Sequence, residues 1–136
     1  ERLPAGPNGL LSSGDPDRQV RTIAVSGGSG DSFLEAARQA GADVYLCADL
    51  RHHPSSEHLE GGAPDLLCGS HWATEWPWLP TLATRLRQAA QEAGVELTVT
   101  VSTMCTEPWT AHRPTTGPTA QYAGTGPTSA AEGTNA

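Results

Sequence analysis

Short apolar runs alternate with segments of helical character through the middle of the chain. Four runs rich in β-branched and apolar residues are expected to form strands, at residues 22–25, 44–47, 65–68 and 96–101, and residues 10–11 are expected to add a short edge. Strands that alternate with helices are typical of an α/β domain. The pattern therefore predicts a layered α/β sandwich over residues 20–109, with a mostly parallel or mixed sheet flanked by helices.

The predicted helices have recognisable ends. Ser32 and Glu35 have the spacing of a capping box, in which both side chains bind free backbone N–H groups, and Gly41 is a suitable stop. A short helix is expected at residues 55–60 and a longer one at residues 79–93. Four residues of the longer helix recur at helical spacing and are expected to face the sheet: Leu79, Leu82, Leu86 and Ala90.

The two ends of the chain differ in composition from its middle. Residues 1–19 are turn-rich and are expected to form a linker or edge segment. From residue 110 onward Thr, Gly, Pro, Ala and Ser dominate, and too little apolar surface is available to offset the entropy of ordering, so residues 110–136 are predicted to be a disordered tail. Because Glu1 is not a start methionine, the sequence is interpreted as part of a longer protein.

Composition and charge exclude several classes of partner. The 136 residues carry 8 basic and 15 acidic side chains, a net charge of -7, and the basic residues are scattered, so no nucleic-acid partner is expected. Apolar runs are far shorter than the roughly 20 residues that span a bilayer, and no secretory signal opens the chain, so no membrane partner is expected. The three cysteines lack C-x-x-C spacing and predict reduced thiols in a cytoplasmic protein.

The most informative motif sets an imidazole and a carboxylate four residues apart, at His71 and Glu75. One helical turn would place both on the same face. Nitrogen and oxygen donors together suit a divalent cation such as zinc, iron, manganese or nickel. The motif therefore indicates two metal ligands, and the alternative is a capping carboxylate beside a packed or exposed histidine.

A second polar cluster, Asp49, His52 and His53, follows the predicted strand at residues 44–47. His71 follows the next predicted strand, and the carboxyl ends of parallel strands meet at one edge of a sheet. We therefore expect the cluster to lie behind the metal ligands or to face a substrate. The alternative is a solvated loop in which Asp49 bonds a histidine. Two further histidines lack such a setting and are expected to be exposed: His58 and His112.

A glycine-rich loop is expected between the first long strand and the following helix. It comprises Gly27, Gly28, Ser29 and Gly30, and its backbone N–H groups are placed to bind a phosphate or carboxylate. The alternative is a tight strand-to-helix turn. Phe33 occupies the position of the third glycine in the dinucleotide fingerprint, which disfavours a nicotinamide or flavin site.

Three of the four tryptophans crowd around the candidate ligands. They are expected either to pack in a core or subunit interface or to form a stacking wall for a heterocyclic substrate. The full set is Trp72, Trp76, Trp78 and Trp109.

Three segments together resemble one known family. They read IAVSGGSGDSF at residues 23–33, GADVYLCADLRHH at residues 41–53 and GSHWATE at residues 69–75. Their order and spacing are similar to the carboxyl-terminal half of the NIF-three-like family, whose members are often named GTP cyclohydrolase I type 2 homologues. The likeness covers roughly residues 3–110, and its most specific part is the His-x-x-x-Glu element.

The resemblance implies a centre of two divalent cations in a cleft between two similar α/β halves, and assembly into a ring-like homohexamer. It maps His71 and Glu75 onto metal ligands. The remaining family ligands, a His pair and an Asp, belong to an amino-terminal half that this sequence does not contain. His52 and His53 belong to the carboxyl-terminal motif and not to that His pair.

Three hypotheses for function follow. The first is the carboxyl-terminal part of a metal-dependent hydrolase, in which two cations about 3.5–4 Å apart activate water; the resemblance implies a purine nucleotide such as GTP as substrate. The second is a non-catalytic, metal-binding oligomeric or regulatory protein. The third is a nucleotide-binding Rossmann domain, whose cofactor binding would survive His71→Ala.

Overall fold

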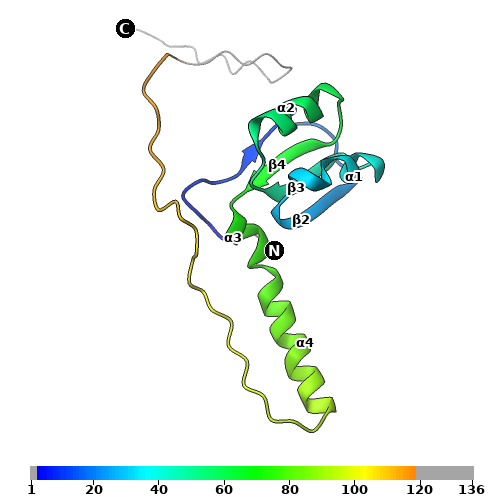
Figure 1. Cartoon of the computed structure of the whole chain (residues 1–136), viewed down its shortest axis with the longest axis vertical. Coiled ribbons are helices and arrows are strands. Elements are labelled where there is room, and N and C mark those ends of the chain that lie inside the picture. Colours follow the sequence, from blue (N-terminus) through cyan, green and yellow to red (C-terminus); the bar gives the residue numbers. More distant parts are fainter. Residues whose placement is uncertain (1–2, 119–136) are drawn as a thin grey trace.

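The computed structural model describes residues 3–118, which contain a four-stranded sheet of order β1-β4-β3-β2 (Figure 1). The strands are β1 (Leu11–Ser12), β2 (Ile23–Ser29), β3 (Val44–Ala48) and β4 (Asp65–Gly69). β2, β3 and β4 are parallel, and β1 pairs antiparallel with β4. This mixed sheet with its helices confirms the predicted α/β fold class.

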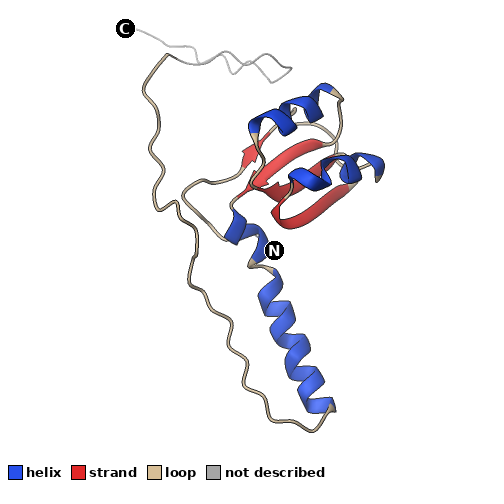
Figure 2. Cartoon of the chain, viewed as in Figure 1, coloured by secondary structure: helices blue, strands red, loops and turns tan. Residues whose placement is uncertain are grey.

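A 3-10 turn and four α-helices connect and follow the strands (Figure 2). They are η1 (Asp31–Phe33), α1 (Leu34–Gln39), α2 (His52–Glu60), α3 (His71–Glu75) and α4 (Trp78–Glu92). Successive parallel strands are added in one direction across the sheet, so the right-handed crossovers place α1 and α2 on the same face. No helix in this part of the chain is both long and apolar enough to cross a membrane.

The core lies between α1 and the central strands. Leu34 and Ala37 of α1 pack with Tyr45 and Cys47 of β3 and Leu66 of β4. β3 has a strand on both sides, and its Tyr45 and Cys47 are only 2% and 0% exposed. Burial raises the pKa of the Cys47 thiol to about 11, as expected of a cysteine that packs as a small apolar side chain.

Two local predictions are wrong. Residues 96–101 form no strand, although their composition suits one, because no described strand pairs with them; a carbonyl in this run, that of Val99, instead accepts a hydrogen bond of 2.7 Å from Arg87 Nη2. The capping box does not form either. Ser32 lies inside the 3-10 turn, and the Glu35 carboxylate accepts a hydrogen bond from Gln39 Nε2 at 3.0 Å.

The long helix is confirmed, but the surface it covers is not the predicted one. α4 points away from the sheet (Figure 1), so its apolar stripe does not face the sheet. Leu86 is 42% exposed, and Ala83 is the buried residue of this helix. The short helix α3 leaves the edge of the sheet and carries α4 outward with it.

His58 is buried and not exposed as predicted, at 7% exposure. It lies on the side of α2 that meets Arg38 of α1, whose Nη2 lies 3.0 Å from His58 Nδ1, and its Nε2 lies 3.0 Å from the Pro64 carbonyl oxygen. Two polar partners make this burial tolerable. His112 is exposed, as predicted. Residues 110–118 contain no helix or strand, and the rest of the predicted tail, 119–136, lies outside the described residues.

Candidate metal site

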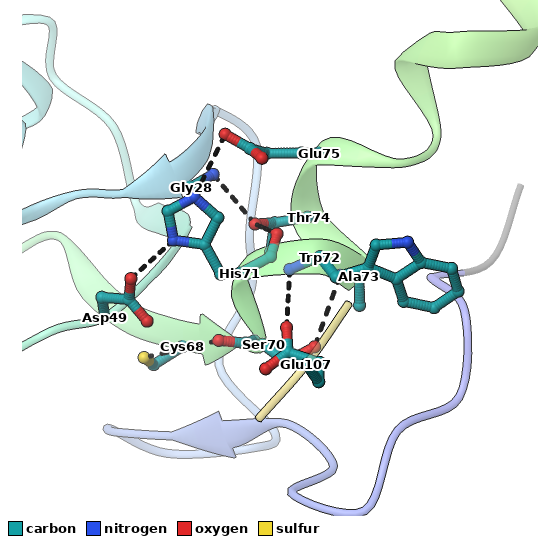
Figure 3. A network of polar contacts seen from close by, with 11 residues as sticks. Gly28, Asp49, Cys68, Ser70, His71, Trp72, Ala73, Thr74, Glu75 and Glu107 are labelled. Atoms are coloured by element: carbon teal, nitrogen blue, oxygen red, sulfur yellow. Dashed lines mark hydrogen bonds and ion pairs between the residues drawn. The ribbon is translucent and has the colours of Figure 1, made fainter. Parts of the chain in front are cut away.

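α3 holds the two candidate ligands at its two ends. It begins with His71 one residue after the N-cap Ser70, directly beyond the carboxyl end of β4, and it ends with Glu75. Ser70 Oγ accepts a hydrogen bond from Ala73 N at 3.3 Å. His71 Nε2 lies 3.2 Å from Glu75 Oε1 (Figure 3), so one helical turn does bring the imidazole and the carboxylate together.

Asp49 holds the other side of the His71 ring. Its Oδ2 lies 2.6 Å from His71 Nδ1. Asp49 follows β3 directly, and its φ of +54° is in the left-handed region, which Asp tolerates better than most side chains. Left-handed backbone in a non-glycine residue is common at functional sites. The turn directs the Asp49 carboxylate toward the end of the neighbouring strand, where His71 begins.

The electrostatics of the site favour a positive charge between His71 and Glu75. The hydrogen bond to Asp49, and then the charges of Glu75 and Asp49, raise the pKa of His71, while partial burial opposes the increase. In neutral His71 the Nδ1–H donates to Asp49, which leaves the Nε2 lone pair facing the Glu75 oxygen at 3.2 Å. Two acceptors this close are stabilised by a proton on Nε2 or by a cation that both atoms bind.

The spacing of the two atoms suits a metal ion. Donors about 2.0–2.1 Å from a tetrahedral zinc ion lie about 3.3 Å from each other, and the observed separation is 3.2 Å. A carboxylate on the far nitrogen of a ligating histidine is the usual arrangement behind such a ligand, and Asp49 has that place. The described residues contain no group of three His, Cys, Asp or Glu that would hold an ion. Metal binding by His71 and Glu75 therefore stays a prediction, and among the described residues the pair has no third donor of these types placed to hold the same ion.

The glycine-rich segment lies against this pair. β2 continues through Gly27 and Gly28 to Ser29, so these residues end a strand and do not form a loop. A Cβ on Gly28, whose φ is +71°, would lie 2.7 Å from Glu75 Oε1 and 2.9 Å from His71 Nε2. The absence of a side chain at Gly28 is therefore what lets β2 approach α3.

Two backbone N–H groups of this segment already have partners. Gly28 N donates to Thr74 Oγ1 at 3.0 Å, and Gly30 N donates to the Ala48 carbonyl at 3.0 Å. The three glycines also allow close packing of neighbouring atoms. Anion binding by Gly27, Gly28, Ser29 and Gly30 is not tested by these contacts and stays a prediction.

The two histidines that were predicted to lie behind the ligands or to face a substrate lie on a different helix from the His71–Glu75 pair. His52 and His53 form the first turn of α2, where both are exposed and their rings meet edge to face at 5.2 Å. Among the described residues, neither has a hydrogen bond or ion pair to His71 or Glu75. Their proposed contact with a substrate stays a prediction.

Three tryptophans line a cavity beside Glu75, as their spacing along the chain indicated. Trp72, Trp76 and Trp78 border a space of about 490 Å³. The rings of Trp72 and Trp76 have centroids 6.1 Å apart and are tilted by 44°. Trp109 instead lines a second cavity of about 340 Å³, together with His71 and other residues. Neither of the two predicted roles for the tryptophans is tested by this placement.

Three residues that support the site were missed from sequence. Ser70 could have been recognised, because Ser directly before a helix is a preferred N-cap. Thr74 accepts from Gly28 N and donates to the His71 carbonyl at 3.0 Å, and nothing in its spacing marks this role. Glu107 Oε1 accepts a hydrogen bond of 2.6 Å from Trp72 N, across a sequence separation of 35 residues, so no local pattern connects the two.

The fold and the site define an α/β protein with a histidine–carboxylate pair at the carboxyl ends of the parallel strands of a mixed sheet. The model of one family, described as Duf34/NIF3 (NGG1p interacting factor 3), matches residues 2–108, and the chain belongs to this family. The match confirms the resemblance that the three sequence segments carry.

Two named relatives agree with this family assignment. A Streptomyces coelicolor protein named GTP cyclohydrolase 1 type 2 homolog is 52% identical over 112 residues, covering 82% of this chain and 39% of the relative. A Mycobacterium bovis protein of the same name is 43% identical, covering 79% of this chain and 27% of the relative. The chain thus spans less than half the length of these relatives.

Two solved structures share the fold. A Bacillus cereus protein related to NIF3 matches with a TM-score of 0.67 and 25% identity, over 74% of this chain and 27% of that one. A Staphylococcus aureus protein matches with a TM-score of 0.69 and 26% identity, over 81% of this chain and 34% of that one.

Proposed function

We propose that His71 and Glu75 are metal ligands in the carboxyl-terminal part of a dinuclear, metal-dependent hydrolase. The observation that carries this proposal is the 3.2 Å separation of His71 Nε2 and Glu75 Oε1, with Asp49 bound to the far nitrogen of the ring. Separation, donor types and supporting carboxylate all agree with the geometry of a ligated divalent cation.

The residues of this chain would prepare the site for a cation in three ways. Asp49 accepts the Nδ1 proton of His71, which keeps the Nε2 lone pair available and directed at the site. Glu75 supplies a negative oxygen, and Gly28 leaves room beside both donors. Bound divalent cations would supply Lewis acidity and activate a water molecule. Further ligands and the second cation would come from outside the described residues.

The substrate class that we propose is a purine nucleotide such as GTP. It is supported by the name of the relatives, GTP cyclohydrolase 1 type 2 homolog. The metals that suit the donors are zinc, iron, manganese or nickel. We further propose a cytoplasmic homo-oligomer, a hexamer for the full-length protein, on the basis of the family resemblance.

One observation favours a second candidate, a non-catalytic metal-binding or regulatory protein. Two carboxylates that line the same cavity as His71 already accept hydrogen bonds, Asp49 from His71 and Glu107 from the backbone of Trp72. Each of these carboxylates thus has a structural role, and among the described residues no histidine or carboxylate beside the pair is identified as a general base. In this alternative the cations stabilise the assembly and no substrate is turned over.

Zinc titration with detection by NMR tests the metal assignment. The ring resonances of His71 should shift on addition of Zn²⁺, and His71→Ala or Glu75→Ala should weaken binding at least about tenfold. His53→Ala is the matched control, because His53 is an exposed histidine on another helix. Equal zinc affinity in wild type and both ligand variants would refute the assignment. Hydrolysis of GTP in the presence of zinc or manganese then separates the hydrolase from the non-catalytic alternative.

A further inference from the structure

A carboxyl-terminal segment returns to α3 after a long excursion along the chain. At one end of the segment, the Ser102 carbonyl accepts a hydrogen bond of 2.7 Å from Trp76 Nε1. At its other end, Glu107 Oε1 accepts one of 2.6 Å from Trp72 N (Figure 3). Residues 102–107 therefore contact the helix that carries both candidate metal ligands.

α3 depends on contacts of this kind for its own stability. It has five residues, and isolated helices shorter than about 12–15 residues are marginal in water. Two N–H groups of its first turn have side-chain partners, Ala73 N with Ser70 and Trp72 N with Glu107. The bond to Glu107 is charge-assisted, and a carboxylate at a helix N-terminus also interacts favourably with the helix dipole.

The geometry points to Glu107 as a positioning residue for the metal site. We infer that its bond to Trp72 N fixes the first turn of α3, and with it the orientation of His71 relative to Glu75. In this role Glu107 acts through the helix backbone, because its Oε1 accepts the hydrogen bond of the Trp72 amide. This inference rests on the proposed function, because the orientation matters only if His71 and Glu75 share a cation.

The experiment compares three chains by NMR: wild type, Glu107→Ala and Glu107→Gln. In Glu107→Ala we expect the Trp72 amide to exchange with solvent at least about tenfold faster, because a hydrogen bond to a charged group is lost. We also expect zinc affinity, followed through the His71 ring resonances, to fall by about 10–100-fold. Glu107→Gln keeps an acceptor oxygen and should restore most of both properties.

The same NMR spectra provide a control variant and the results that would contradict the inference. Glu96→Ala removes an exposed carboxylate outside residues 102–107 and should change neither exchange nor zinc affinity. Amide resonances of β3 report whether each variant is folded. Unchanged Trp72 exchange in Glu107→Ala, or faster exchange with unchanged zinc affinity, would overturn the positioning role alone. Because this chain supplies only two of the proposed ligands, weak binding by wild type is expected. No shift of the His71 ring resonances even at millimolar zinc would overturn the proposed function and the positioning role together.

Discussion

Gly28 is the residue at which a single added methyl group would most directly disturb the site. A Cβ there would lie 2.7 Å from Glu75 Oε1 and 2.9 Å from His71 Nε2, at a φ of +71°. Gly28→Ala should therefore lose zinc binding and unfold at lower urea concentration, because left-handed backbone costs an alanine about 1–2 kcal/mol before any clash.

Gly94→Ala separates the backbone effect from the steric one. Gly94 has a φ of +66° but has open space where its Cβ would lie. Urea unfolding should show a loss of about 1–2 kcal/mol for Gly94→Ala, a larger loss for Gly28→Ala, and unchanged zinc affinity for Gly94→Ala alone. Equal zinc affinity in the two variants would show that Gly28 does not face the ligands.

The protonation of His71 predicts how zinc binding depends on pH. Asp49 raises the pKa of His71, and only the neutral ring can ligate a metal, so protons compete with zinc from a higher pH than for an ordinary histidine. In Asp49→Asn the pKa of His71 should fall, and the pH at which zinc is lost should fall with it, although affinity at high pH weakens. In the metal-free chain, a raised folded-state pKa adds stability below the unfolded pKa and loses it as pH rises through the folded pKa.

NMR titration of the His71 ring measures its pKa in the absence of zinc and the pH at which zinc is lost in its presence. A higher pKa of His71 in Asp49→Asn would contradict the assigned role of Asp49.

Local spacing explains why some site residues were predicted and others were not. His71 and Glu75 are separated by one helical turn, so a helix alone brings them together. Asp49 required only the rule that parallel strands end at one edge. Glu107 lies 35 residues from its partner Trp72, in a segment without regular structure, and no periodicity encodes such a contact.

Arg38 is the main polar connection between α1 and the end of α2. Its guanidinium donates to the carbonyl groups of His58 at 2.6 Å, Gly61 at 2.8 Å and Ala63 at 2.8 Å. Arg38→Ala should lower the free energy of unfolding by about 2–4 kcal/mol, because several charge-assisted hydrogen bonds are lost together.

Urea unfolding of Arg38→Ala and of Arg21→Ala measures this effect. Arg21 is exposed, and its replacement should stay within about 0.5 kcal/mol of wild type. Equal stability of the two variants would show that solvent replaces the bonds of Arg38. The hydrogen bonds that are lost connect α1 and α2 and do not involve α3. Zinc binding at α3 should therefore be unchanged under conditions in which Arg38→Ala is folded.

Three predicted elements have almost the ends that the sequence indicated, and a fourth extends well beyond them. β3, β4 and α4 agree with their apolar patterns within one residue, because those patterns reflect burial or helical periodicity. β2 extends four residues beyond its apolar run, into Gly27 and its neighbours. Glycine has low strand propensity, and the close packing of α3 on β2 outweighs it here.

Across the whole molecule, an apolar pattern shows which surface is suited to burial. It does not show which other element that surface packs against. The stripe on α4 predicted a helix packed on the sheet, and the helix formed without that contact. Residues 96–101 are a second example. Their composition is strand-like, but they have no strand partner among residues 3–118. Both features depend on neighbours that are distant in sequence.

Amide hydrogen exchange tests this difference between composition and pairing. β3 lies between β2 and β4, so both sets of its backbone groups are bonded and its amides should exchange slowest in the molecule. Residues 96–101 pair with no described strand, so most of their amides should exchange within about tenfold of the rate in an unfolded peptide.

β1 is the internal control, because its two residues bond on one side only and should show intermediate protection. Protection of residues 96–101 equal to that of β3 would mean that this run finds a strand partner in solution. Its slow exchange should then disappear on dilution if the partner is a second copy, because a bond between copies weakens with falling protein concentration.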